Sequence, residues 1–228
     1  MAFSPQGLAH ILDGLRPAAA SGALVVAFSG GVDSLVLLAS LARLRESGAG
    51  DGIAGLRAVH VNHRLHPDAG RWQERCRDLA ATLDVPFTAE TVSIPAAAPH
   101  GIEAAARAAR YEVLYRQLAP GDILLTAHHA DDQLETVLLA LLRGSGVRGM
   151  AGMPGSRPAG QGWHQRPLLD FTRAELIAWA TEQGLNWTDD PANAEPRYSR
   201  SYLRHAVVPL LRERWPAVAA VAMTWAMM

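Results

Sequence analysis

The strongest constraint on the fold is the segment VVAFSGGVDSLVLLASL, residues 25–41, in which an apolar run leads through two glycines into a helical pattern. Residues 24–28 form the unbroken apolar run of a buried strand, and leucine and alanine recur at helical spacing over residues 35–41. The intervening turn, residues 29–34, therefore connects a strand to the N-terminus of a helix. Glycines let such a turn approach a ligand closely, and the first amides of a helix attract anions.

The turn has the chemistry of an anion cradle that needs a metal ion. Its candidate ligand-binding residues are Ser29, Gly30, Gly31, Val32, Asp33 and Ser34. All 21 basic residues of the chain are arginine, so the cradle has no phosphate-binding lysine. Asp33 would repel a phosphate group unless a divalent cation lay between them, and the turn therefore predicts such a cation. The alternative is an ordinary strand-to-helix turn in which Asp33 or Ser34 caps the helix.

Strand and helix patterns alternate along the first 150 residues. We expect strands near residues 24–28, 56–61, 87–92 and 122–126, and helices near residues 34–46, 69–83, 102–118 and 130–143. This alternation predicts an α/β fold with a doubly wound, mostly parallel sheet, in which ligands bind at the carboxyl ends of the strands. A glycine- and proline-rich stretch after Arg143 indicates a long loop or hinge. Helices near residues 172–183 and 198–214 form a short C-terminal extension.

Composition narrows the class of protein. The 228 residues are 49% hydrophobic and 19% charged, no apolar run is long enough to span a membrane, and residues 1–17 lack a signal-peptide pattern, so we expect a cytoplasmic protein. The single cysteine, Cys76, has the helical spacing of a core residue and cannot form a disulfide or a cysteine cluster within the chain.

A nucleic-acid partner would need a local basic patch, because the net charge is only −1. The candidate patch lies in the C-terminal extension, and the alternative for it is a solvated helix face. It contains Arg197, Arg200, Arg204, Arg212 and Arg214, with Tyr198 and Tyr202 between them.

Two further segments carry candidate functional side chains. HVNHRLHPDA, residues 60–69, follows the second expected strand and offers His60 and Asn62, unless these only satisfy a strand end. GIEAAARAARYEVL, residues 101–114, places Glu103, Arg107 and Arg110 on one helical stripe. Taken alone, that stripe would be an ordinary salt-bridged helix surface.

The segment LLTAHHADDQLETVLLALL, residues 124–142, begins at the fourth expected strand. His128, Asp132 and Glu135 follow each other at helical spacing, which places one imidazole and two carboxylates on one side of a helix start. Together with Asp33 they form an oxygen-rich site suited to Mg²⁺. Carboxylates in a first turn also stabilise the helix dipole, and a His-x-x-x-Asp pattern can bind zinc. Neighbouring strand ends bring both loops to one cleft, which favours Mg²⁺.

With these motifs in place, SGGVDS resembles the pyrophosphate loop of the ATP pyrophosphatases, which activate substrates by adenylylation. The resemblance implies an adenine nucleotide α-hydrolase-like fold with a five-stranded sheet. The other three segments are similar to the branch of that family that makes lysidine in tRNA. Residues 166–211 also follow that branch, in the spacing of Arg166, Trp187, Asp189, Asp190, Asn193, Tyr198, Arg200 and Arg204. The chain departs from it at His66, where arginine is usual, and at Ser201, where asparagine is usual.

The resemblance implies a function and a set of site residues. It implies ATP-dependent ligation of free L-lysine to C2 of the wobble cytidine of tRNA(Ile) with anticodon CAU, through an adenylylated cytidine. ATP would lie on residues 29–34 with His60 and Asn62 near the adenosine, and Mg²⁺ on Asp33, Asp132 and Glu135. The implied catalytic residues are Asp33, Arg107, Arg110, His128, Asp132 and Glu135.

The resemblance also implies an organisation of the chain, and rival functions stay open beside it. Residues 1–150 would form the ATP-binding domain, residues 151–165 a glycine-rich loop, and residues 166–228 the remainder of the catalytic domain with its helical extension. The rivals are an ammonia-dependent synthetase, a tRNA thiolase and a non-catalytic nucleotide-binding module. A thiolase would need reactive cysteines, which disfavours it. A homodimer stays open.

Overall fold

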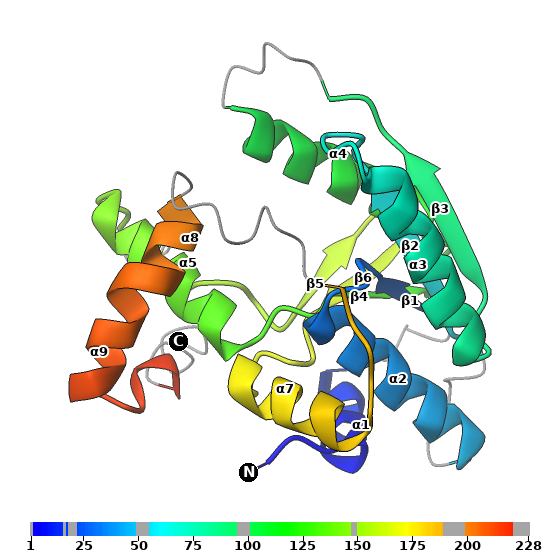
Figure 1. Cartoon of the computed structure of the whole chain (residues 1–228), viewed down its shortest axis with the longest axis horizontal. Helices are drawn as coiled ribbons and strands as arrows, with labels where there is room; N and C mark the ends of the chain where they lie inside the picture. Colours follow the sequence, from blue (N-terminus) through cyan, green and yellow to red (C-terminus); the bar gives the residue numbers. More distant parts are fainter. Residues whose placement is uncertain are drawn as a thin grey trace.

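A six-stranded sheet forms the centre of the protein (Figure 1). The computed structural model describes residues 2–15, 17, 22–48, 55–94, 101–146, 150–188 and 199–220. In spatial order the strands are β3 (Phe87–Thr91), β2 (Arg57–Asn62), β1 (Leu24–Ala27), β4 (Ile123–Leu125), β6 (Gly162–Gln165) and β5 (Ser156–Ala159). All neighbouring strands are parallel except β5, which runs antiparallel to β6. The α/β class and the mostly parallel sheet are therefore confirmed.

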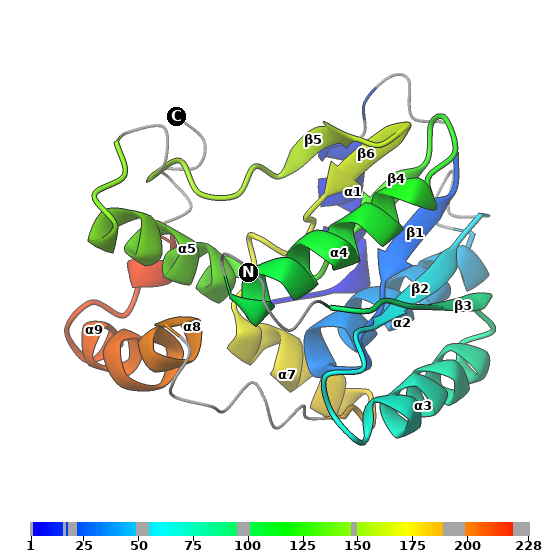
Figure 2. The ribbon, with the colours of Figure 1, turned by 90° about the horizontal axis from the view of Figure 1, so that it is seen from above.

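Helices cover both faces of the sheet because its strands alternate between two cores (Figure 2). Leu24 and Val26 of β1 pack into the larger core, which is covered by α1 (Pro5–Leu15), α2 (Val32–Glu46), α3 (Ala69–Thr82) and α7 (Arg173–Glu182). Val25 points to the opposite face and packs with Leu114 of α4 (Ile102–Arg116). Cys76 lies in the larger core with 1% of its surface exposed, as its spacing predicts.

The predicted five-stranded sheet and the glycine-rich loop over residues 151–165 need correction. The stretch contains the β5–β6 hairpin, so the sheet has six strands and takes up residues beyond position 150. The glycines that indicated a loop serve this hairpin. Gly160 has φ of +56° at its turn, and a Cβ atom on Gly162 would lie 2.2 Å from the carbonyl oxygen of Asp122. Only glycine allows β6 to approach the start of β4 so closely.

The remaining helices lie together beyond the sheet, on one side in both views (Figures 1 and 2). They are α5 (Ala130–Leu142), α8 (Ser199–Tyr202) and α9 (Val208–Arg214), joined around a small core that includes Leu134 and Val208. The single helix predicted over residues 198–214 is interrupted by a π-helical turn, Leu203–Val207. Pro209 near the start of α9 cannot donate a backbone hydrogen bond to a continuous α-helix, which accounts for the change of winding there.

Among the described helices, none combines the length and hydropathy that crossing a membrane would require.

Candidate functional site

The turn after β1 is shaped by its two serines and by a glycine in the left-handed region. Gly30 has φ of +78°, and a Cβ atom there would lie 2.8 Å from Sγ of Cys76, so the backbone is pressed against α3. The hydroxyl of Ser34 donates to the carbonyl of Gly31 and lies 3.1 Å from the hydroxyl of Ser29. Gly31 is the N-cap of α2 and supplies no side-chain cap, so the first amides of α2 keep their capacity to bind an anion.

Asp33 is held in the first turn of α2 beside this cradle. Among the described residues, no hydrogen-bond donor reaches its buried Oδ1 atom. The nearest charged partner of Oδ1 is Arg173 of α7, with Nε at 3.8 Å, and Oδ2 lies 3.8 Å from Nε2 of His129. Burial raises the pKa of Asp33 against the opposing fields of His129 and Arg173. A carboxylate oxygen left without a donor, next to an anion cradle, is well suited to a cation.

His129 joins this carboxylate to the start of α5 and was missed by the sequence reasoning, which singled out His128. It is the N-cap of α5: its Nδ1 accepts from the amide of Asp132, and its own amide donates to Oδ2 of Asp132. Its side chain is 1% exposed and lies within 3.8 Å of Asp33, Asp131 and Asp132. The signal in the sequence was the spacing His-x-x-Asp before an apolar run, which is the spacing of a capping box.

Arg204 binds the two carboxylates that follow on α5. Its Nε donates to Oε1 of Glu135 at 2.6 Å, and its Nη2 donates to Oε2 of Glu135 at 3.1 Å and to Oδ1 of Asp132 at 3.0 Å. Burial raises the pKa of Glu135 although Arg204 opposes the shift. Burial also acts to raise the pKa of Asp132, but His129, His128 and Arg204 together hold it below its ordinary value.

Three arginines of the predicted basic patch bind side chains of α5, and Arg214 is exposed. Arg204 binds α5, the guanidinium of Arg200 donates to the hydroxyl of Thr136 on α5, and Arg212 pairs with Asp131. Arg204 and Arg212 therefore neutralise acidic side chains of this chain, which the alternative of a solvated helix face did not anticipate. Arg197 and Tyr198 lie outside the described residues, as do Asp189, Asp190 and Asn193.

His128 lies at the other side of the same loop, in a chain of polar side chains. Its Nδ1 is 2.8 Å from the hydroxyl of Thr126, which is 2.9 Å from Nε2 of His164 on β6. Burial lowers the pKa of His128 to about 3 and that of His164 to about 2, so both imidazoles are neutral at physiological pH. The sequence reasoning missed Thr126 and His164, because their contact depends on the pairing of β4 with β6.

His60 and Asn62 lie at the end of β2 and make different contacts. Nδ1 of His60 donates to the carbonyl of Phe28, which joins the end of β2 to the turn after β1. Asn62 uses its amide within its own loop: it donates to Gln73 and accepts from the amide of Arg64, which has φ of +51°. The departure at His66 is accommodated by stacking on Trp72. His60 therefore adjoins the turn after β1, whereas Asn62 stabilises the loop after β2.

The two predicted arginines of α4 act on different parts of the site. Nε of Arg110 donates to Nε2 of His63 at 3.2 Å, and burial followed by the charge of Arg110 lowers the pKa of His63 to about 4. Arg107 lies over the ring of Tyr111 at 5.0 Å, and its charge acts on His128. The side chain of Glu103, the third member of the predicted stripe, lies outside the described part of the chain.

The predicted Mg²⁺ ligands are close together but are already engaged. Asp33 and Asp132 both contact His129, and Glu135 is bound through both oxygens by Arg204. Within the described ranges, no group of three or more histidine, cysteine, aspartate or glutamate side chains is arranged to hold a metal ion. Oδ1 of Asp33 accepts no hydrogen bond from the described residues and is therefore available to a cation.

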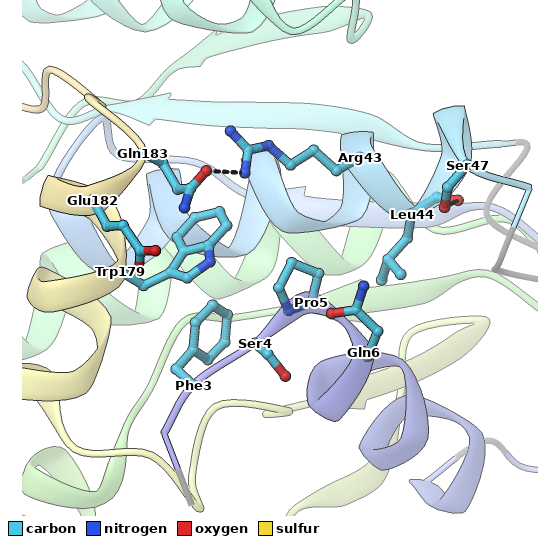
Figure 3. A pocket seen from close by; sticks show the side chains of 10 residues that line it. All are labelled: Phe3, Ser4, Pro5, Gln6, Arg43, Leu44, Ser47, Trp179, Glu182 and Gln183. Atoms are coloured by element: carbon cyan, nitrogen blue, oxygen red, sulfur yellow. Dashed lines mark hydrogen bonds between the residues drawn. The ribbon is translucent and has the colours of Figure 1, made fainter.

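A separate pocket of about 470 Å³ lies at the opposite end of α2, between the first residues of α1 and the end of α7 (Figure 3). Arg43 lies over the ring of Trp179 at 5.2 Å and donates to Gln183 at 2.5 Å. The pocket is remote from the carboxyl ends of the strands, where Asp33, His128 and Asp132 lie. It is therefore distinct from the candidate site.

The arrangement of a glycine turn, a first-turn aspartate and a facing α5 defines the class of protein. The PP-loop domain matches residues 6–211, so the chain belongs to the PP-loop family. Within that family it is similar to the tRNA(Ile)-lysidine synthases of Pseudomonas aeruginosa, with 46% identity over 93% of this chain and 47% of that protein, and of Alkalilimnicola ehrlichii, with 49% identity over 94% and 46%. The chain spans about half the length of these curated relatives.

Solved structures share the fold at low sequence identity. The U34-tRNA thiolase NcsA from Methanococcus maripaludis, which carries a [4Fe-4S] cluster, superposes with a TM-score of 0.75 at 14% identity, covering 97% of this chain and 76% of that one. The NH3-dependent NAD synthetase from Campylobacter jejuni has a TM-score of 0.51 at 15% identity, with coverage of 99% and 94%. These likenesses establish the architecture alone.

Proposed function

We propose that this chain carries out the ligase chemistry of a tRNA(Ile)-lysidine synthase. The reaction joins free L-lysine to C2 of the wobble cytidine of tRNA(Ile) with anticodon CAU and consumes ATP to AMP and pyrophosphate. The observation that carries the proposal is the identity of 46–49% to two curated lysidine synthases across more than nine-tenths of this chain. The geometry agrees, because the PP-loop turn, Asp33 and the start of α5 form one cluster of contacts.

In the first step the carbonyl oxygen at C2 of the cytidine attacks the α-phosphate of ATP, and pyrophosphate leaves. We assign the phosphates to residues 29–34 and the first amides of α2, which have no competing side-chain cap. The guanidinium groups of Arg107 and Arg110 are the cations assigned to charge that develops on the phosphates. Alignment and charge neutralisation supply the acceleration, since no protein nucleophile is needed.

Mg²⁺ fits this site through Asp33. The Oδ1 atom of Asp33 is buried without a donor among the described residues, and ionising this carboxylate is disfavoured until a cation approaches. When bound, Mg²⁺ would neutralise the charge of the ATP phosphates, and Asp33 would be the carboxylate that holds it. Asp132 and Glu135 are available as further ligands only to the extent that Arg204 releases them.

In the second step the ε-amine of lysine attacks C2 and AMP leaves. The amine must lose a proton on the way. Asp132 and Glu135 are the carboxylates assigned to receive the ammonium groups of free lysine, in place of the guanidinium of Arg204 that binds them in this structure. Asp132 is the better anion of the two, since its pKa is lowered whereas that of Glu135 is raised. The cytoplasm, where tRNA and free lysine occur, is the compartment we assign.

The rival functions are less well supported. A tRNA thiolase shares the fold but needs reactive sulfur chemistry, and burial raises the pKa of the single cysteine, Cys76, to about 12. An ammonia-dependent synthetase shares the fold but does not account for the identity of 46–49% to lysidine synthases over more than nine-tenths of this chain. A non-catalytic nucleotide-binding module would not need the buried carboxylates of α5.

The test measures pyrophosphate release from ATP with Mg²⁺, with and without unmodified tRNA bearing CAU, and then the transfer of radiolabelled lysine to that tRNA. We expect label on the tRNA only when ATP and the CAU anticodon are both present. The matched controls are the same tRNA with a changed wobble base and the Asp33→Asn variant of the chain.

Each outcome separates one hypothesis from another. Pyrophosphate release without label transfer would mean that activation occurs and the lysine site is misassigned. Release that depends on ammonia and not on tRNA would favour an ammonia-dependent synthetase. Nucleotide binding without any release, unchanged in Asp132→Asn, would favour the non-catalytic module.

A further inference from the structure

A series of hydrogen bonds leads from two arginines to His128, and the arginines fix which group donates at each step. Arginine guanidinium groups can only donate hydrogen bonds. Two routes of hydrogen bonds lead to His164. The first begins at Arg157, whose Nη2 donates to the hydroxyl of Tyr115. The second begins at Arg166, whose Nη2 lies 3.4 Å from Nδ1 of His164. The hydroxyl of Tyr115 accepts from Arg157 and can then donate its own hydrogen to Nδ1 of His164, at 3.2 Å. Both routes make Nδ1 of His164 an acceptor.

The direction passes unchanged through Thr126. Because the buried His164 is neutral, an acceptor at Nδ1 places its one ring hydrogen on Nε2, which donates to the hydroxyl of Thr126 at 2.9 Å. The threonine has a single hydroxyl hydrogen, and this is then directed to Nδ1 of His128 at 2.8 Å. His128 therefore accepts at Nδ1 and carries its ring hydrogen on Nε2. Among the described residues, no partner contacts that Nε2 atom.

The charged groups near His128 indicate what kind of ligand atom its Nε2–H group can bind. The charged groups that act on it are Asp132 of α5, Arg107 of α4, Arg166 after β6 and Arg200 of α8. Three arginines and one carboxylate make an environment for an anionic oxygen, and they disfavour an imidazolium. The three arginines favour a neutral imidazole that donates to such an oxygen, and the carboxylate of Asp132 opposes it.

We infer that Thr126 and His164 are positioning residues that hold His128 in its Nε2–H tautomer, so that His128 donates a hydrogen bond to an anionic oxygen of the substrate. His128 is then not the base that deprotonates the lysine amine, because Nε2 has no lone pair to offer and Nδ1 is occupied by Thr126. The part of this inference that concerns the substrate rests on the proposed function. The tautomer itself does not.

The test observes the tautomer directly, in the whole chain labelled with ¹⁵N at histidine and without ATP, lysine or tRNA. We expect long-range ¹H–¹⁵N spectra to show His128 protonated at Nε2 and unprotonated at Nδ1, without change between pH 8 and pH 5. His128→Gln identifies its resonances among the nine histidines. Thr126→Val should shift His128 to a mixture of tautomers, whereas the matched control Thr126→Ser, which keeps the hydroxyl, should not. A Nδ1–H tautomer or an imidazolium at pH 6 would overturn the inference.

A second measurement tests the donor role in pyrophosphate release. The amide nitrogen of glutamine can occupy the position of Nε2–H, so His128→Gln should keep activity within about tenfold of the original chain, while His128→Ala should lose about a hundredfold, the scale of one lost donor. Equal losses in both variants would identify His128 as a base and refute the donor role. A chain that releases no pyrophosphate at all would count against the proposed function, while the spectra would still decide the tautomer.

Discussion

Substituting Gly30 by alanine tests how the PP-loop turn is built. The residue has φ of +78°, which costs an L-residue about 1–2 kcal/mol. The new Cβ atom would also lie 2.8 Å from Sγ of Cys76. That is roughly 0.7 Å inside ordinary van der Waals contact, and overpacking of this kind costs about 1–3 kcal/mol more. We therefore expect Gly30→Ala to lower the free energy of unfolding by about 3 kcal/mol.

Urea denaturation of four variants separates the two contributions. Gly48→Ala is the matched control, because Gly48 has φ of +65° and a Cβ atom there would meet nothing within 4 Å, so only the backbone cost of about 1 kcal/mol should appear. Cys76→Ala removes the sulfur at a cost of about 1 kcal/mol. In the Gly30→Ala/Cys76→Ala double variant the clash is absent, so its destabilisation should be smaller than the sum of the single changes by about 1–2 kcal/mol.

The double-mutant cycle tests whether contact with Cys76 limits the size of the side chain at position 30. If the two changes add to within about 0.5 kcal/mol, the contact does not limit the turn and the reasoning fails. If Gly30→Ala costs no more than Gly48→Ala, the close approach to α3 is also refuted.

Three further predictions concern buried polar groups and close packing. Burial lowers the pKa of His164 from 6.5 to about 2, so only the unfolded chain takes up a proton at this residue as the pH falls below 6.5. The free energy of unfolding should therefore fall by about 2 kcal/mol between pH 7 and pH 5 on account of His164. His164→Gln should flatten that pH dependence in urea denaturation. Arg204→Met should destabilise the protein by about 3 kcal/mol at pH 7, because it leaves Glu135 buried and unpaired. Adding Glu135→Gln should restore part of that stability, and no restoration would contradict the pairing. Gly162→Ala should cost about 3 kcal/mol, because its Cβ would meet the rigid backbone of Asp122, and a change below about 1 kcal/mol in thermal unfolding would refute that contact.

Much of the fold could be predicted because it is encoded locally. The four strands expected within residues 24–126 are all present, and the central ones, β1 and β4, are short apolar runs. Thr172 and Glu175 form a capping box at the start of α7, where a helix was expected, and that motif depends only on residues three apart. The β5–β6 hairpin could not be found this way: its register depends on a parallel pairing with β4, and its glycines have the same local appearance as a loop.

The amino-acid sequence by itself determined the residues of the PP-loop turn and their position between a strand and a helix, because the conformation of such a turn depends on glycines and on near neighbours. Tertiary structure alone decided what these residues meet. Cys76 closes against Gly30, His129 and not His128 contacts Asp33, and Arg204 reaches back to Glu135 across 69 positions. Such contacts depend on the packing of α3, α5 and the C-terminal helices around the ends of the strands. The sequence therefore shows which chemical groups are present. The packed fold determines which partner each group meets, and the partner determines the group's charge state and tautomer.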